Sequence, residues 1–171
     1  MRDHDWIRDA AGRYERPLLA YVRGLLGDPH RCRDVVQEAF LELCRADRAE
    51  VEPKLAPWLF TVCRRRAIDI LRKDRRMTTL TLSPGADPPT RECGPAEALE
   101  ARDATQAVFA RLARLPASQQ EAVRLRFLQQ FSYRDIAGVM GLTESHVGVL
   151  LHLALKTLRE SCANPAPEAQ S

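Results

Sequence analysis

The chain has 171 residues, 45% hydrophobic and 29% charged, which suits one larger domain or two small helical domains with buried cores. Its net charge of +3 is unevenly spread, since residues 1–77 carry 17 Lys and Arg against 13 Asp and Glu, whereas residues 96–171 carry 8 of each. The amino terminus has no apolar signal region, and the longest apolar run, 147–155, is too short to cross a bilayer. A cytoplasmic protein without a membrane partner is expected.

Five cysteines form an odd set with no CxxC or Cys/His ligand spacing. This pattern argues against a disulfide framework or a zinc site and indicates reduced thiols. Cys44 and Cys63 fall on apolar helical faces and are expected in the core. No metal and no cofactor is expected.

Apolar residues at helical spacing predict a first helix over residues 5–26. Pro17 lies inside this pattern, so the segment forms either one kinked helix or two helices that meet just before the proline. Asp28 is placed to cap a second helix over residues 29–45, with Pro29 at its first position.

The second predicted helix has one apolar face and one polar face. Its apolar residues are Val35, Val36, Ala39, Phe40, Leu43 and Cys44. Its polar face carries Asp34, Gln37, Glu38 and Glu42. Such a face is usually just solvated, so these residues alone do not indicate a function.

Residues 46–57 contain two prolines and are predicted to form a loop before a third helix over residues 57–76. The apolar side of that helix consists of Leu59, Val62, Cys63, Ala67, Ile70 and Leu71. The opposite side carries Arg65, Arg72, Lys73 and Arg76, flanked by Arg64, Arg66 and Arg75, and we call these seven residues the basic strip. Asp69 and Asp74 among them are interpreted as surface ion-pair partners. A one-sided basic strip on a rigid helix is typical of a phosphate-binding surface, although a solvated face or an acidic protein partner would also fit.

Residues 78–95 are rich in Thr, Pro and Gly and lack helical periodicity, so they predict a linker between domains at 1–77 and 96–162. Two further helices are predicted in the second domain. Their core sides are Ala98, Leu99, Val108, Leu112 and Leu115, and then Ala122, Val123, Leu125 and Phe127. Residues 163–171 are expected to be a disordered tail. The fold class is therefore all-α, with two small helical domains joined by a linker.

Residues 132–160 predict two helices separated by a tight turn. Ser132 and Asp135 approximate a capping box, Gly141 suits the turn, and Thr143 can cap the next helix. A small residue at Ala137, the glycine and a β-branched residue at Val147 are what a helix-turn-helix requires. The alternative is an ordinary helical hairpin in a bundle core.

Placing successive residues about 100° apart separates the two faces of the last helix. The inward residues are Val147, Leu150, Leu151, Ala154, Leu155 and Leu158. The outward residues are Ser145, Val149, His152, Lys156 and Arg159. Because this outward face is poor in charge, it offers few phosphate contacts if it enters a major groove.

Taken together, these segments resemble a small sigma factor of the extracytoplasmic-function (ECF) type, a sigma-70 group with only regions 2 and 4. The motifs that carry the resemblance are YERPLLAYVRGLLGD, DVVQEAFLELCR, WLFTVCRRRAIDILR, LPASQQEAVRLRF and SYRDIAGVMGLTESHVGVLLHLALKTLR, in the family's order. The resemblance covers residues 13–159 and implies a polymerase subunit that directs promoter recognition and opening, bound to core RNA polymerase and promoter DNA.

The resemblance also implies roles for individual residues. Docking on the clamp helices of the polymerase β′ subunit falls to Asp34, Gln37 and Glu38. Contacts to the minus-ten promoter element fall to Arg65, Arg66, Arg72, Lys73 and Arg76, and the loop before them helps to capture a flipped base. Contacts to the minus-thirty-five element fall to Ser145, His146, Val149, His152 and Lys156, while the same domain meets the β flap. The linker runs toward the active-site cleft, and an anti-sigma factor is a common further partner.

Two departures from the family pattern matter. Arg65 stands where the family often has Asn, and the last helix has Gly148, Leu150, Leu153 and Leu155 where Lys and Arg are typical. Because phosphate neutralisation dominates affinity, the second departure predicts weak or unusual binding to the minus-thirty-five element.

Three other classes of function compete with the sigma-factor interpretation. A helix-turn-helix regulator outside the polymerase would leave the basic strip and the acidic second helix unassigned. An enzyme would need convergent carboxylates, a metal cluster or an activated nucleophile, and the four histidines are scattered along the chain. A purely structural interaction module would tolerate loss of the arginines. No enzymatic activity is expected.

Overall fold

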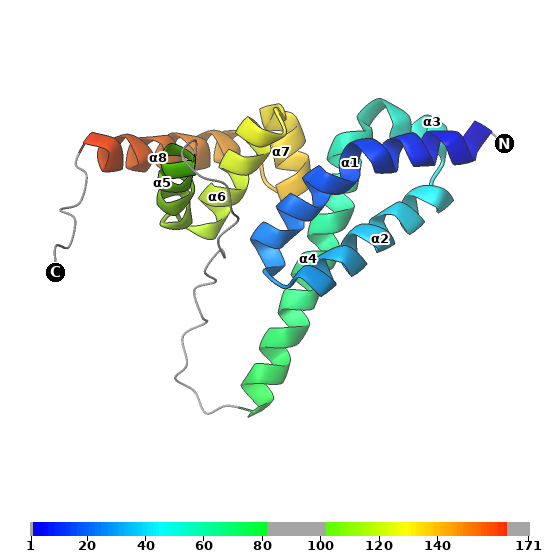
Figure 1. Cartoon of the computed structure of the whole chain (residues 1–171), viewed down its shortest axis with the longest axis horizontal. Coiled ribbons are helices and arrows are strands. Elements are labelled where there is room, and N and C mark those ends of the chain that lie inside the picture. The colour runs from blue at the N-terminus through cyan, green and yellow to red at the C-terminus, as the bar shows by residue number, and fades with distance from the viewer. Residues whose placement is uncertain (1, 82–101, 164–171) are drawn as a thin grey trace. The chain divides into compact units, whose positions relative to one another are not determined.

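The computed structural model describes residues 2–81 and 102–163, all but short connections in helices, and contains no strand within those ranges (Figure 1). The chain divides into two compact units, the first built on residues 1–91 and the second on most of residues 92–171. The prediction of an all-α fold is confirmed for the described residues. The predicted linker falls mostly, and the predicted tail almost entirely, outside them.

The N-terminal unit is built from three long helices, α1 (Arg2–Leu26), α2 (Pro29–Arg45) and α4 (Leu55–Thr81), each of which packs on the other two. In Figure 1 they run from blue through cyan to green. Fully buried side chains fill the space between them: Leu18, Val22, Val35, Leu43, Leu59, Phe60 and Cys63. The rings of Tyr21 and Phe60 meet with centroids 5.0 Å apart, which joins α1 to α4.

The junction between α1 and α2 follows the prediction. The Asp28 carboxylate accepts hydrogen bonds from the backbone amides of His30 at 2.8 Å and Arg31 at 3.3 Å, and Pro29 begins the helix. These bonds hold the pKa of Asp28 below its usual value, with the amide of His30 contributing most. Pro17 does not divide the first segment, because α1 continues through it as one helix.

The prediction of a loop over residues 46–57 is wrong. The segment folds into a short helix, α3 (Arg48–Val51), and a 3₁₀ turn, η1 (Glu52–Lys54), before α4 begins. Asp47 caps α3 by accepting the amide of Ala49 at 2.9 Å, and Arg48 pairs with Glu52 one turn later. The two prolines sit in the first turns of η1 and α4, where the missing N–H would have had no helical partner anyway.

Three further expectations for this unit need correction. Cys44 is exposed rather than in the core. Ile70 and Leu71 are only half-buried, and Ile70 lines the groove between α2 and α4. Finally, α4 continues to Thr81, into the segment predicted as linker.

The C-terminal unit contains α5 (Arg102–Ala113), α6 (Ala117–Val123), a π-helical turn η2 (Arg124–Leu128), α7 (Tyr133–Met140) and α8 (Glu144–Ala163). Helices α5 and α6 both pack on α8. The buried side chains of this unit are Leu112, Leu115, Ala122, Val123, Leu125, Phe131, Ile136, Ala137, Val147, Leu150, Leu151 and Ala154.

Two residues predicted for this core are instead exposed, Val108 at 51% and Phe127 at 55%. The π-helical turn accounts for Phe127. Its wider i→i+5 turns shift the register after Val123, so that Leu125 and then Phe131 face the core. A simple 3.6-residue period cannot anticipate that shift.

No single helix among the described residues is long and apolar enough to cross a membrane. Only α7 and α8 taken together reach that threshold, and they are bent by 101° at the break between them.

Candidate nucleic-acid interface

The basic strip lies on the side of α4 that the core leaves uncovered. Leu59, Cys63 and Ala67 are buried on one side of the helix. The exposed side carries Arg65, Arg72, Lys73, Arg75 and Arg76, while Arg64 and Arg66 are half-buried. The helix therefore presents cations over about three turns on a rigid support, as the sequence predicts.

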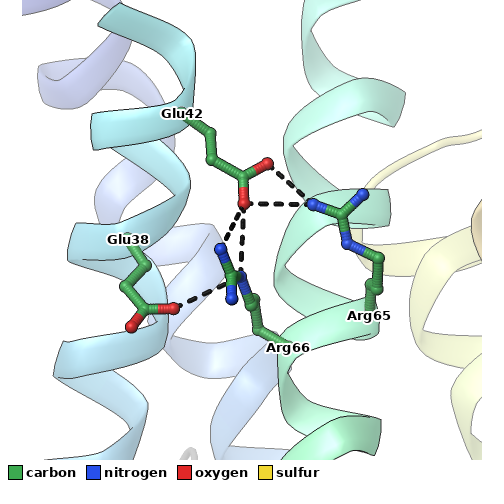
Figure 2. Close-up of polar contacts among 4 residues, drawn as sticks. All are labelled: Glu38, Glu42, Arg65 and Arg66. Atoms are coloured by element: carbon green, nitrogen blue, oxygen red, sulfur yellow. Dashed lines mark hydrogen bonds and ion pairs between the residues drawn. The ribbon is translucent and has the colours of Figure 1, made fainter. Parts of the chain in front are cut away.

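The N-terminal part of the strip, Arg65 and Arg66, binds to α2 through the carboxylate of Glu42 (Figure 2). Arg65 donates through Nη2 to both oxygens of Glu42, at 3.0 and 2.8 Å. Arg66 donates to the same carboxylate through Nε at 3.2 Å and Nη2 at 2.7 Å. Its Nε also lies 3.3 Å from Glu38. Two arginines and two glutamates thus form one four-membered cluster, which we call the Glu42 cluster.

The charge state of the Glu42 cluster follows from its hydrogen bonds. Burial opposes ionisation of Glu42, but the hydrogen bonds from Arg66 and Arg65 outweigh it and hold the pKa of this carboxyl below its usual value. The hydrogen bond to Glu42 likewise raises the pKa of the Arg66 guanidinium. Both shifts favour the charged forms of Glu42 and Arg66. The formal charges of the two arginines and two glutamates in the cluster sum to zero.

A groove between α2 and α4 brings the two predicted contact surfaces together. It is lined by Asp34 and Glu38 from the acidic face of α2 and by Arg66, Arg72, Lys73 and Arg76 from the basic strip. Gln37 is exposed on α2. The residues predicted to meet the polymerase thus adjoin those predicted to meet DNA.

The aspartates of α4 both have basic partners. Asp74 accepts a hydrogen bond from Arg31 of α2 at 2.6 Å, and Asp69 lies 4.0 Å from Arg72 one turn along the same helix. Their interpretation as surface ion-pair partners is confirmed. The role of Glu42 as the shared partner of two arginines was not predicted, although its spacing of four residues from Glu38 places both on one helical face toward α4.

The turn between α7 and α8 has the hydrogen bonds that the sequence predicts. Ser132 and Asp135 bond reciprocally, with the Asp135 amide donating to Ser132 Oγ and the Ser132 amide to Asp135 Oδ2, each at 3.1 Å. Gly141 adopts φ +67°, and the next amide, Leu142, donates to the carbonyl of Ala137 at 3.0 Å, which is the Schellman arrangement. Thr143 Oγ1 accepts the amide of His146 at 3.2 Å. The bend of 101° between α7 and α8 lies in the range of helix-turn-helix motifs.

The solvent-facing side of α8 carries all five residues predicted to contact the minus-thirty-five element, and Arg159 of the predicted outward face is exposed as well. The five are Ser145, His146, Val149, His152 and Lys156, and every one is exposed. Val149 is 54% exposed and Leu153 43%, whereas Lys156 lies 4.0 Å from Glu160. This surface is thus as poor in free positive charge as the sequence suggests.

The described residues also bear on two other kinds of site, a metal site and a reactive thiol. Within residues 2–81 and 102–163, no group of three or more His, Cys, Asp or Glu is placed to hold a metal ion. Burial raises the pKa of the Cys63 thiol to about 12, with the charge of Glu42 as a smaller cause.

Comparisons with known proteins identify both halves of the chain. The family model for sigma-70 region 2 matches residues 11–77, and that for sigma-70 region 4 matches residues 105–158. The chain is 24% identical over 147 residues to the ECF RNA polymerase sigma factor SigM of Bacillus subtilis, covering 85% of this chain and 88% of SigM. It is 32% identical over 106 residues to the ECF sigma factor RpoE of Cereibacter sphaeroides, covering 62% of this chain and 57% of RpoE.

A solved structure shows the same fold. The sigma factor RpoE of Bartonella quintana, crystallised with the anti-sigma factor NepR, matches with a TM-score of 0.66 and 22% identity, over 93% of this chain and 98% of that one.

These matches decide between the interpretations that the sequence left open. A regulator outside the polymerase is not favoured. Such a regulator would account only for the C-terminal half, which matches sigma-70 region 4, whereas the N-terminal half matches sigma-70 region 2. Sigma factors are generally non-enzymatic. With both regions matched in order and ECF sigma factors among its relatives, the chain belongs to the ECF group of the sigma-70 family and is an RNA polymerase sigma factor.

Proposed function

We propose that the N-terminal unit joins core RNA polymerase to the minus-ten promoter element through two adjacent surfaces. Asp34, Gln37 and Glu38 dock on the clamp helices of the β′ subunit. The basic strip contacts the DNA as it opens. The observation that carries this proposal is the groove between α2 and α4, where both sets of residues meet.

The DNA contacts are proposed for four of the exposed members of the strip, Arg65, Arg72, Lys73 and Arg76. Arg66 was predicted to contact DNA with them. Its side chain instead points toward Glu42 and Glu38, so in this proposal Arg66 joins α4 to α2. Guanidinium groups suit this task because they stay charged and bind phosphate oxygens in pairs. Positive charge on a rigid helix also lowers the cost of separating strands by holding the single strand that is released.

We propose that residues 96–162 act as the region 4 domain and place α8 against the minus-thirty-five element through Ser145, His146, Val149, His152 and Lys156. With Lys156 the single cation among these five, few phosphates can be neutralised, so this contact is weak by itself. The affinity then comes from the minus-ten contact and from docking of the same domain on the β flap. Residues 78–95 serve as the linker toward the active-site cleft.

The proposed setting is the cytoplasm, where the polymerase and its promoters are. An anti-sigma factor is proposed as a further partner, supported by the relative that was crystallised with NepR.

Charge reversal on α2 tests the docking surface. The variant Asp34→Lys with Glu38→Lys should lose co-purification with core polymerase, because both exposed acids would then repel a basic partner. A reversal of one exposed acid on α1, Asp9→Lys, serves as the control and should retain it. Retention of the polymerase by the double variant would refute the proposed docking surface.

A further inference from the structure

The two arginines of the Glu42 cluster are held in different ways. Arg66 uses its Nε and Nη2 together on Glu42 and also faces Glu38, so the donor edge that would grip a phosphate is occupied. Within the described part of the chain, Arg65 reaches Glu42 through Nη2 only, which leaves Nε and Nη1 as available donors. The Arg65 side chain is also more exposed, at 57% against 42%.

Glu42 itself is better fixed than either arginine. Its side chain is 23% exposed and comes from α2 beside the buried Leu43, and its two oxygens accept four hydrogen bonds. Figure 2 shows both guanidinium groups reaching this one carboxylate, Arg66 from below and Arg65 from the side. A carboxylate held in this way restricts the rotamers of a long side chain that would otherwise move freely.

We propose that Glu42 is a positioning residue for promoter recognition, which fixes Arg65 as an oriented DNA contact and, together with Glu38, removes Arg66 from the charge offered to DNA. This inference rests on the proposed function, since it assumes that α4 faces the minus-ten element. Its consequence is selectivity. A neutral cluster contributes little to indiscriminate phosphate attraction, while the oriented donors of Arg65 act where the DNA has the right shape.

The variant Glu42→Gln tests the proposal because glutamine keeps the shape and loses the charge. The freed guanidinium groups should then bind any phosphate. The salt dependence of binding to a random-sequence duplex should steepen by about 0.9 in log–log slope for each new phosphate contact, which is about threefold in affinity between 50 and 200 mM salt. In the holoenzyme, the preference for a promoter over the random duplex should fall by a similar factor.

Two further variants make the result specific. Asp5→Asn removes one exposed acid from an ion pair on α1 and raises the net charge equally, so it controls for bulk charge. Adding Arg66→Gln to Glu42→Gln should return most of the slope toward the wild-type value, because Arg66 is the cation that Glu42 withholds. An unchanged slope in Glu42→Gln, or an equal steepening in Asp5→Asn, would overturn the proposal.

Folding is measured separately by thermal unfolding of the full chain. If Glu42→Gln does not fold, Arg65→Gln and Arg66→Gln decide the question in its place. Arg65→Gln should reduce the salt slope on promoter DNA and leave the melting temperature unchanged. Arg66→Gln should lower the melting temperature and leave the salt slope unchanged. Equal effects of the two variants would overturn the proposal. If the wild-type holoenzyme starts at no promoter, the proposed function itself fails, whereas the slopes on random duplex still report on Glu42.

Discussion

Arg31 of α2 and Asp74 of α4 lie 2.6 Å apart, 43 residues apart in the chain, and join these two helices away from the Glu42 cluster. Glu42 joins the same helices with four hydrogen bonds. The two connections differ in exposure, because the Arg31 and Asp74 side chains are 46% and 37% exposed, whereas Glu42 is 23% exposed. The less exposed Glu42 connection should therefore contribute more to the free energy of unfolding than the Arg31–Asp74 pair.

Removing the exposed connection should have a small effect. Asp74→Asn is expected to lower the free energy of unfolding by less than about 1 kcal/mol, since water and salt screen the pair. Glu42→Gln should cost more, about 1–2 kcal/mol, because it weakens several charge-assisted hydrogen bonds at a less exposed site. Urea unfolding of both variants measures the difference. A larger loss in Asp74→Asn than in Glu42→Gln would contradict this ranking.

The Glu42 contribution should depend on pH in a defined direction. Its pKa is lower in the folded chain than the ordinary value of 4.5, so its stabilisation is fully present above pH 4.5 and is lost as the pH falls through the folded-state pKa. Glu42→Gln should remove that component. The difference in unfolding free energy between wild type and variant should therefore shrink on acidification, and a constant difference down to strongly acidic pH would contradict the assignment.

Arg72 and Lys73, in the C-terminal part of the basic strip, should contribute to the salt dependence of promoter binding. Replacing Arg72 and Lys73 with Gln should reduce the log–log slope by about 0.7–0.9 for each lost contact, and should reduce strand opening. Arg8→Gln on α1, whose side chain is 81% exposed, is the matched control and should leave the slope unchanged. Holoenzyme binding across a salt series gives the result.

The glycines of the helix-turn-helix should respond oppositely to alanine. A Cβ at Gly148 would lie 3.7 Å from Tyr133 Cε2, an ordinary contact, so Gly148→Ala should stabilise the chain by about 0.5–1 kcal/mol. Gly141 has φ +67°, so Gly141→Ala should destabilise it by about 1–2 kcal/mol although nothing crowds the site. Destabilisation by both substitutions would show that Gly148 is needed for close packing.

Two cysteines should differ in reactivity. Cys44 is exposed, whereas Cys63 is buried and its pKa is raised to about 12. Because the thiolate is the reactive form, a thiol-alkylating reagent at neutral pH should label Cys44 and spare Cys63 in the native chain. Peptide mass spectrometry distinguishes the two sites. Prompt labelling of Cys63 under native conditions would contradict the packing of α4 against α1 and α2.

Local signals in the sequence predicted much of the fold. Asp28, Ser132 and Gly141 act over a few residues, and the structure places their hydrogen bonds and backbone angles as expected. The short helix and 3₁₀ turn over residues 48–54 were not predicted, because two prolines in a segment usually indicate a loop. Here each proline stands in the first turn of a helical element, where proline is tolerated. Phe127 was misplaced because a π-helical turn leaves no mark in apolar periodicity.

The candidate site was only partly predictable for a related reason. The strip on α4 and the acids on α2 are each visible as periodic patterns within one helix. Their pairing is not, because the contact between Glu42 and Arg65 spans 23 residues and depends on how the helices cross. The sequence alone therefore predicted two separate surfaces, whereas the structure shows one groove with charges of both signs.

Transcription in vitro tests the central claim most directly. Core polymerase with the purified chain should initiate at defined sites in a promoter library, with a shared minus-ten sequence upstream of the starts. Reversal of Asp34 and Glu38 should abolish those starts. Random initiation, or none above core polymerase alone, would contradict the account.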